Sequence, residues 1–156
     1  MRKRRFFGAA VSVAVFASLL NIALSASEKD YNDPWPLIPK EYKYLKNPIP
    51  RNEENLLSGE RLYDINCSPC HGGNLDGKWP EAAGLFPPPP NLIGLVSIIK
   101  PPQSYLFWRT KEGGPGLPKE WRPWDSAMPV WKEELKDEEI WQIILYIYEA
   151  TGEAPP

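Results

Sequence analysis

The pattern of hydrophobic and polar residues predicts one long apolar segment, one segment interrupted by prolines and a helical body. Phe6 to Ala26 is almost wholly apolar, broken only by Asn21 and three serines. Residues 28–56 carry prolines at too high a density for a long helix. Apolar residues at helical spacing then predict helices over Asn55–Asn66, over Ser104–Lys111 and from Lys136 to Gly152.

The last of these helices has the clearest signals. Asp137, Glu138 and Glu139 supply acidic side chains in its first turn, where the helix dipole favours them. Gly152 ends the apolar run, as glycine commonly does at the end of a helix. We expect the apolar stripe to form part of the core; its members are Ile140, Ile143, Ile144, Ile147 and Tyr148.

Composition and charge narrow the class of protein. All 19 prolines of this 156-residue chain lie after residue 33, so much of the body must be loop. After Ser27 the chain has 14 basic and 20 acidic residues, a formal charge of −6, which disfavours binding to nucleic acid. Two cysteines cannot form a disulfide-rich scaffold.

Residues 1–27 predict export from the cytoplasm. Arg2 to Arg5 are all basic and precede the 21-residue apolar stretch. A cleaved signal has an apolar core of about 7–15 residues, and a spanning helix needs about 20. The length therefore fits a retained anchor, while Ala23-Leu24-Ser25 fits a cleavage site, and both alternatives stay open. In either case the basic cluster places the body outside the membrane, on the periplasmic side in a bacterium.

Residues 28–51 form a proline-rich strap. Trp35, Tyr42 and Tyr44 stand among its prolines, and free linkers rarely contain so many aromatic residues. We expect the strap to pack on the core of its own domain. A docking segment for a partner subunit is the alternative.

The candidate chemistry lies in Cys67-Ser68-Pro69-Cys70-His71. Cys-x-x-Cys-His is the attachment signature for c-type haem, in which each thiol bonds one vinyl group and the histidine becomes an axial ligand of the iron. A thioredoxin-like redox pair would need a βαβ setting. A zinc site would need four ligands, but the chain has no further Cys or His. A plain disulfide would leave His71 without a role. We therefore predict one haem c, bonded through Cys67 and Cys70.

Elimination identifies a second axial ligand. The iron of an electron carrier takes a second strong ligand, most often His or Met. His71 is the only histidine, and Met128 is the only methionine besides Met1. The alternative for Met128 is a place in the core, which is the common fate of methionine. We predict Met128 as the second ligand, with a haem potential raised by its weakly donating sulphur.

The motif and its flank resemble a known family. Gly59-x-x-Leu62-Tyr63, followed by Cys67-x-x-Cys70-His71-Gly72, resembles the class I cytochromes c of the small monohaem bacterial type. The resemblance covers residues 52–152 and leaves residues 153–156 as a tail. It implies an all-α fold of three to five helices around one covalent haem, with the first and last helices crossing. Trp141 and Tyr148 would then meet Leu62 and Tyr63.

The resemblance also implies roles for other residues. Ala127-Met128-Pro129 is similar to the family's distal Met-Pro loop, and Pro87 to Leu92 is similar to its Pro-x-Leu segment. The latter implies that the carbonyl of Pro90 accepts the Nδ1 proton of His71. Arg109 and Trp124 are both candidates to bind a haem propionate, and nothing in the sequence selects between them.

Two classes of function remain. The first is periplasmic transfer of one electron, between or within membrane respiratory or molybdenum-oxidoreductase complexes, as the resemblance implies. Haem with both axial positions filled by protein has no vacancy for a substrate, which favours this class over enzymes. The alternative is a haem enzyme or gas sensor with an open or labile sixth position. The acidic body predicts redox partners with basic docking patches.

Overall fold

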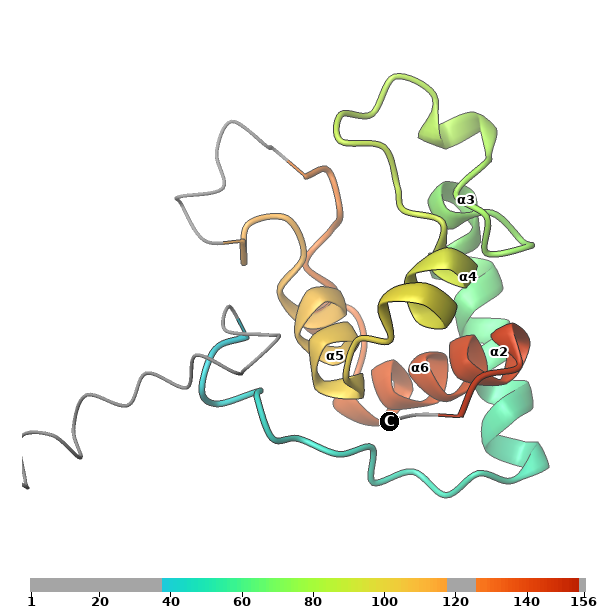
Figure 1. Ribbon diagram of the computed structural model, residues 1–156, viewed down its shortest axis with the longest axis vertical. Coiled ribbons are helices and arrows are strands. Elements are labelled where there is room, and N and C mark those ends of the chain that lie inside the picture. The colour runs from blue at the N-terminus through green and yellow to red at the C-terminus, as the bar shows by residue number, and fades with distance from the viewer. Residues whose placement is uncertain (1–37, 118–125, 155–156) are drawn as a thin grey trace, which may run out of the picture. The chain divides into compact units, whose positions relative to one another are not determined.

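A computed structural model describes residues 38–117 and 126–154 (Figure 1). The chain divides into the units Met1–Pro36 and Leu37–Pro156, and all described residues belong to the second. The predicted signal or anchor, residues 1–27, and the first part of the predicted strap lie outside the described ranges.

The described ranges contain helices, turns and loops but no strand, so the predicted all-α fold class is confirmed. The α-helices are α2 (Glu53–Asn66), α3 (Ser68–His71), α4 (Leu92–Gly94), α5 (Gln103–Glu112) and α6 (Asp137–Thr151). A π-helix, η2 (Leu95–Ile99), continues α4, and two short 3-10 helices are η1 (Pro80–Ala82) and η4 (Trp131–Glu133). Within these ranges, no helix combines the length and the apolar character that crossing a membrane requires.

The three predicted body helices are present, with boundaries shifted by one or two residues. α2 begins two residues before the predicted start because Asn52 caps it, its side chain accepting a hydrogen bond from the Asn55 amide at 2.9 Å. At the start of α6 the Glu139 carboxylate accepts from the Lys136 amide at 2.8 Å. The predicted stripe of α6 is buried, with all five members at most 6% exposed.

The closest helix pair is α2 and α6, which cross at Gly59. A Cβ built on Gly59 would lie only 2.1 Å from the carbonyl oxygen of Gln142, so a larger residue would push the helices apart. Polar bonds flank the crossing, because the Gln142 amide accepts from the Ser58 hydroxyl and donates to the Asn55 side chain. Tyr63 packs against Tyr146, with ring centroids 5.4 Å apart. The first and last described helices therefore cross, as the resemblance implied.

Two aromatic side chains of α6 have partners outside α2. Trp141 stacks on Phe107 of α5, with centroids 4.1 Å apart and planes 9° from parallel. The Tyr148 hydroxyl donates to the Pro101 carbonyl at 2.7 Å. Trp141, Tyr148 and Tyr63 nevertheless share one buried cluster, and Leu62 packs against it. The direct pairing of these residues across the crossing stays a prediction. Trp141 and Tyr148 face α5 and the turn before it.

The described part of the strap, residues 38–51, packs on α5 and α6. Ile38 is 4% exposed. The Lys43 carbonyl accepts from the Ser104 hydroxyl at 3.2 Å, and the side-chain amide of Asn47 donates to the Trp141 carbonyl at 3.0 Å. These contacts are the kind expected of a strap that packs on the core of its own domain.

Replacing Gly59 with Ala should destabilise the domain by about 1–3 kcal/mol, the usual cost of overpacking a close contact. The added methyl would meet the backbone of Gln142, which cannot move without shifting α6. The measurement is denaturant unfolding followed by far-ultraviolet circular dichroism.

Gly94→Ala is the matched control. Gly94 has ordinary helical dihedral angles, and a Cβ there would meet only the Asn91 side chain at 3.8 Å. Equal stability losses in the two variants would show that the crossing at Gly59 is not tight.

Candidate haem site

The Cys-x-x-Cys-His motif forms the turn that directly follows α2. The Cys67 amide donates to the Tyr63 carbonyl at 2.8 Å, which continues the helical bonding of α2 into the motif. The Cys67 carbonyl then accepts from the amides of Cys70 and His71, at 3.1 and 2.8 Å. This single turn, α3, brings the two cysteines and the histidine into one short helical stretch at the end of the longer helix.

Both cysteines are free thiols with intermediate exposure. Burial among surrounding protein atoms nevertheless raises the pKa of Cys67 to about 12 and lowers the pKa of His71 below its ordinary value. Desolvation favours the uncharged form of each of these two groups.

His71 is positioned from two sides. Its Nδ1 lies 3.5 Å from the carbonyl oxygen of Pro90, which are the two atoms that the resemblance pairs. Its own carbonyl accepts from the Gly77 amide at 2.8 Å. A proton on Nδ1 directed at Pro90 leaves the lone pair of Nε2 for a metal.

A buried tyrosine holds the residue after His71. The Tyr63 hydroxyl donates to the Gly72 carbonyl at 2.8 Å, and the Tyr63 side chain has no exposed surface. Burial raises the pKa of Tyr63, so the hydroxyl stays a donor throughout the physiological range. The same residue that packs α2 on α6 thus also fixes the exit of the motif.

Met128 lies on a segment that packs tightly against the end of α5. Its carbonyl accepts from the Gly114 amide at 2.8 Å, and the residue is half-buried. A Cβ on Gly114 would lie 1.8 Å from the Ser126 carbonyl oxygen, and one on Gly113 would lie 2.2 Å from that of Pro129. Figure 1 shows the orange segment 126–130 and the green helix α3 rising above the helical core on opposite sides.

Trp124 and Arg109 are the two candidates for binding a haem propionate. Trp124 lies outside the described residues. The Arg109 guanidinium donates to the Gly113 carbonyl at 2.7 Å and lies 5.3 Å from the centre of the Trp108 ring. Burial lowers the pKa of Arg109. Arg109 therefore caps the C-terminal end of α5, where the chain leaves the helix at Gly113. Its bond to a haem propionate stays a prediction.

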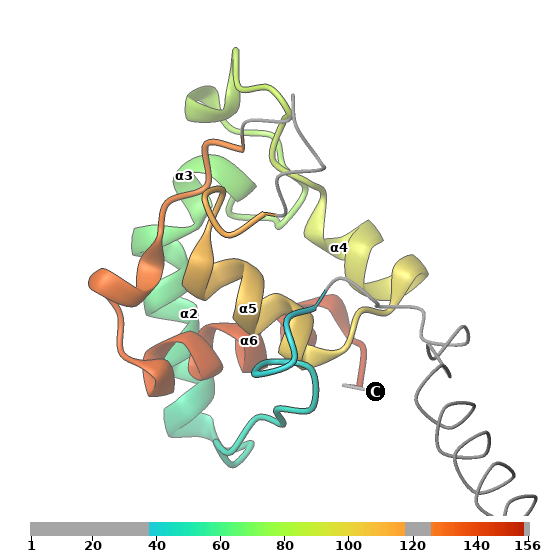
Figure 2. The same cartoon turned by 90° about the vertical axis from the view of Figure 1, so that its left-hand side faces the viewer.

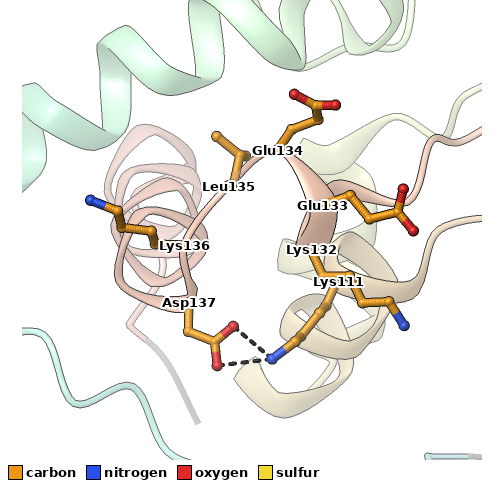
Figure 3. Close-up of a pocket in the computed structure, with 7 residues that line it drawn as sticks. All are labelled: Lys111, Lys132, Glu133, Glu134, Leu135, Lys136 and Asp137. Atoms are coloured by element: carbon orange, nitrogen blue, oxygen red, sulfur yellow. Dashed lines mark hydrogen bonds and ion pairs between the residues drawn. The ribbon is translucent and has the colours of Figure 1, made fainter.

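A separate hollow lies where η4 meets the start of α6 (Figure 3). It has a volume of about 420 Å³ and is lined by Lys111, Lys132, Glu133, Glu134, Leu135, Lys136 and Asp137. Lys111 pairs with Asp137 at 2.6 Å across it. None of the predicted site residues contributes to this hollow. Among the described residues, no three or more His, Cys, Asp or Glu side chains are grouped to hold a metal ion.

Comparison with known proteins identifies the fold. The family model described as cytochrome C oxidase, cbb3-type, subunit III matches residues 54–147. The chain belongs to this family. It is therefore a c-type cytochrome with the cytochrome c-like all-α fold, and the family implies a covalently bound haem c with iron and haem-based electron transfer.

One curated protein shares a shorter similarity. Photosystem II extrinsic protein V of Cyanidium caldarium is 33% identical over 61 residues, which cover 35% of this chain. The match spans only 37% of the length of that relative. No solved structure matches the chain.

The residues of this cytochrome fit the group that the family implies. Two unbonded thiols lie one helical turn apart, as two thioether bonds to one porphyrin require. Burial lowers the pKa of the His71 imidazole, and its Nδ1 faces the Pro90 carbonyl. Cys67, Cys70 and His71 would hold the group from the α3 side. Haem c supplies reversible one-electron chemistry at its iron.

Sequence reasoning missed the backbone contacts that position the site. The bond from Tyr63 to Gly72 and the approach of Gly113 and Gly114 to the segment of Met128 were not predicted. A signal existed for the second contact, since paired glycines between two structured segments often mark close backbone approach. The first contact depends on a side chain and a carbonyl nine residues apart, and hydrophobic patterning carries no information on it.

Replacing Tyr63 with Phe should lower the free energy of unfolding by about 1 kcal/mol, because the Gly72 carbonyl loses a buried hydrogen bond. It should also shift the midpoint potential of the haem, since Gly72 is bonded to His71. Denaturant unfolding and a redox titration of the holoprotein measure the two effects.

Tyr148→Phe is a matched control, because it removes an equally buried hydroxyl that bonds the Pro101 carbonyl. We expect a similar loss of stability without a shift in potential. Equal potentials in both variants and the unaltered protein would contradict a positioning role for Tyr63.

Proposed function

We propose that this cytochrome is a class I, monohaem electron carrier in which His71 and Met128 are the axial ligands. The observation that carries the proposal is the geometry of His71, whose Nδ1 faces the Pro90 carbonyl and leaves Nε2 for the iron. Cys67 and Cys70 attach the haem, and Met128 supplies the sixth ligand from the segment beyond α5. With two protein ligands on the iron, the site is suited to electron transfer rather than to substrate binding.

The chain around these residues is built to limit rearrangement. Gly113 and Gly114 hold the segment of Met128 by close backbone approach, and Tyr63 holds the exit of the motif. A ligand set that keeps its geometry in both oxidation states lowers the cost of gaining or losing an electron. The proposed role of the protein around the haem is thus to keep its ligands in position.

We also propose a location and a class of partner. The basic cluster at residues 2–5 and the apolar stretch 6–26 support a location of the body on the periplasmic side of the cytoplasmic membrane, anchored if the stretch is retained. The formal charge of −6 after Ser27 favours redox partners with basic docking patches. Such a partner belongs to a membrane respiratory or molybdenum-oxidoreductase complex, within which this chain is a mobile carrier or a fixed subunit.

Replacing Met128 with Ala should leave the haem attached and lower its midpoint potential, because a stabilising thioether ligand of ferrous iron is lost. The weak sulphur–iron charge-transfer band at the red edge of the oxidised spectrum should disappear. Redox titration and visible spectroscopy of the holoprotein measure both.

Val130→Ala, two residues along the same segment, is the control and should keep the band. An unchanged potential in Met128→Ala would reject Met128 as a ligand. A high-spin spectrum of the unaltered protein, or one that shifts with carbon monoxide, would instead indicate an open iron and a haem enzyme or gas sensor.

The acidic body should also make the rate of electron transfer depend on salt concentration, in a direction set by the charge of the oxidant. Oxidation by a cationic cobalt complex should slow as ionic strength rises, while oxidation by ferricyanide should accelerate, because screening weakens attraction in one case and repulsion in the other. Stopped-flow rates from about 10 to 500 mM salt measure this; the Debye length falls from about 30 Å at 10 mM to below 8 Å over this range. The same trend for both oxidants would contradict docking of basic partners.

A further inference from the structure

Glu112 stands at a position that its own helix disfavours. It is the last residue of α5, where unpaired carbonyl groups give the helix end a partial negative charge. The helix dipole favours a basic side chain there. Glu112 nevertheless keeps its charge, because the bonds from Lys132 and Tyr42 lower the pKa of its carboxyl more than partial burial raises it. A residue that departs from local preference in this way is expected to serve another part of the structure.

Two segments that are distant in sequence bond this one carboxylate. The Lys132 ammonium of η4 donates to Oε2 at 2.7 Å, and the Tyr42 hydroxyl of the strap donates to Oε1. The Glu112 side chain is only 21% exposed, so solvent screens its pair with Lys132 less than a fully exposed one. Tyr42 is held in turn, because its ring packs 6.2 Å from that of Phe107 and its amide bonds the Pro39 carbonyl at 2.9 Å. We call Tyr42, Glu112 and Lys132 the carboxylate clasp.

The clasp lies at the base of the chain segment that carries Met128. The chain leaves α5 directly after Glu112, and Lys132 follows Met128 by only four residues. Between these ends the outgoing and returning backbones touch, because the Gly114 amide bonds the Met128 carbonyl and Gly113 leaves no room for a side chain beside Pro129. Figure 2 shows α5 between the cyan strap and the orange returning segment in this view. The clasp therefore continues the contacts of the two glycines as far as η4.

We propose that the carboxylate clasp holds the returning segment at the position from which Met128 reaches the iron. Glu112 is a positioning residue, which acts through the backbone that its bonds hold. The glycine contacts fix the segment at Met128 itself, and the ion pair fixes it four residues later, at Lys132. With the segment held at both places, the thioether has less freedom to leave the iron. The proposal rests on the proposed function, in which Met128 is the sixth ligand.

The proposal also gives the strap a part in the site. Tyr42 precedes the family match, which begins at residue 54. Desolvation and the bond to Glu112 raise the pKa of Tyr42, so its hydroxyl stays a donor. Loss of this hydroxyl would leave the ion pair between Glu112 and Lys132 in place. We therefore expect a smaller effect from Tyr42 than from Lys132.

The test measures how readily an added ligand replaces Met128. Imidazole is mixed by stopped flow with the full-chain ferric holoprotein, and the rate at saturating imidazole reports how often Met128 leaves the iron. Glu112→Gln and Lys132→Met should each raise this rate about tenfold, since a bond between two charged groups is lost. Tyr42→Phe should raise it about threefold. The variant with both Glu112→Gln and Lys132→Met should react about as fast as either alone, because both changes remove the same bond.

Lys111→Met is the matched control for Lys132→Met. Lys111 directly precedes Glu112, but its ammonium pairs at 2.6 Å with Asp137 at the start of α6. The control thus removes an equally short ion pair from the same end of α5 without releasing the returning segment. It should lower the free energy of unfolding and leave the rate of imidazole binding unchanged.

A second measurement does not depend on an added ligand. Nuclear magnetic resonance of the ferrous holoprotein follows exchange of the Gly114 amide hydrogen, which bonds the Met128 carbonyl. Lys132→Met should speed this exchange about tenfold, because the segment opens locally more often. Exchange of the Cys67 amide, which bonds the Tyr63 carbonyl at the end of α2, should not change.

Unchanged rates in Glu112→Gln and Lys132→Met, or an equal rise in Lys111→Met, would overturn the proposal. An unchanged rate in Tyr42→Phe would overturn the part assigned to the strap. Met128→Ala separates failure of the clasp from failure of the proposed ligand, because this variant should bind imidazole without waiting for a ligand to leave. If the unaltered protein binds imidazole as fast as Met128→Ala, Met128 is not a ligand and the proposed function fails. If only Met128→Ala is fast, the ligand stands and the clasp fails.

Discussion

The approach of α2 and α6 at Gly59 is the contact on which the rest of the domain depends. α2 carries the cysteines at its end, and α6 contributes the largest buried apolar stripe. α2 buries only Gly59 and Tyr63, and both contact α6 at or beside this crossing. The position of the haem motif is therefore set by a crossing about two turns of helix away, at a residue without a side chain.

Contacts to backbone carbonyls connect this crossing to the haem site and hold the site residues in place. Tyr63 packs at the crossing and bonds Gly72, Pro90 faces the ring of His71, and the Gly114 amide holds the carbonyl of Met128. Each of these contacts uses a backbone carbonyl, a group that every residue possesses. Substitutions that preserve hydrophobicity can thus disturb the site wherever they move one of these carbonyls.

The sequence allowed prediction of the helices and the haem motif because both depend on local patterns. The stripe of α6 and the spacing of Cys67, Cys70 and His71 are visible without a structure. Periodicity shows that Trp141 and Tyr148 are buried but not which neighbours they meet, so the stack on Phe107 and the bond to Pro101 were not predicted. Within α6, the polar Gln142 faces α2 while Trp141 stacks on α5. A hydrophobicity pattern would have assigned these two residues the other way round.

The strap shows how a segment outside the family match is joined to the site. The match begins at residue 54, yet the Tyr42 hydroxyl reaches Glu112, the last residue of α5. Glu112 also accepts from Lys132 at 2.7 Å, and these two bonds lower the pKa of its carboxyl. Glu112 directly precedes Gly113 and Gly114, whose close approach fixes the segment of Met128. One carboxylate thus bonds both the strap and η4 at the point where the chain turns towards Met128. The strap is therefore joined directly to the part of the chain that precedes the proposed distal ligand, although it lies outside the family match.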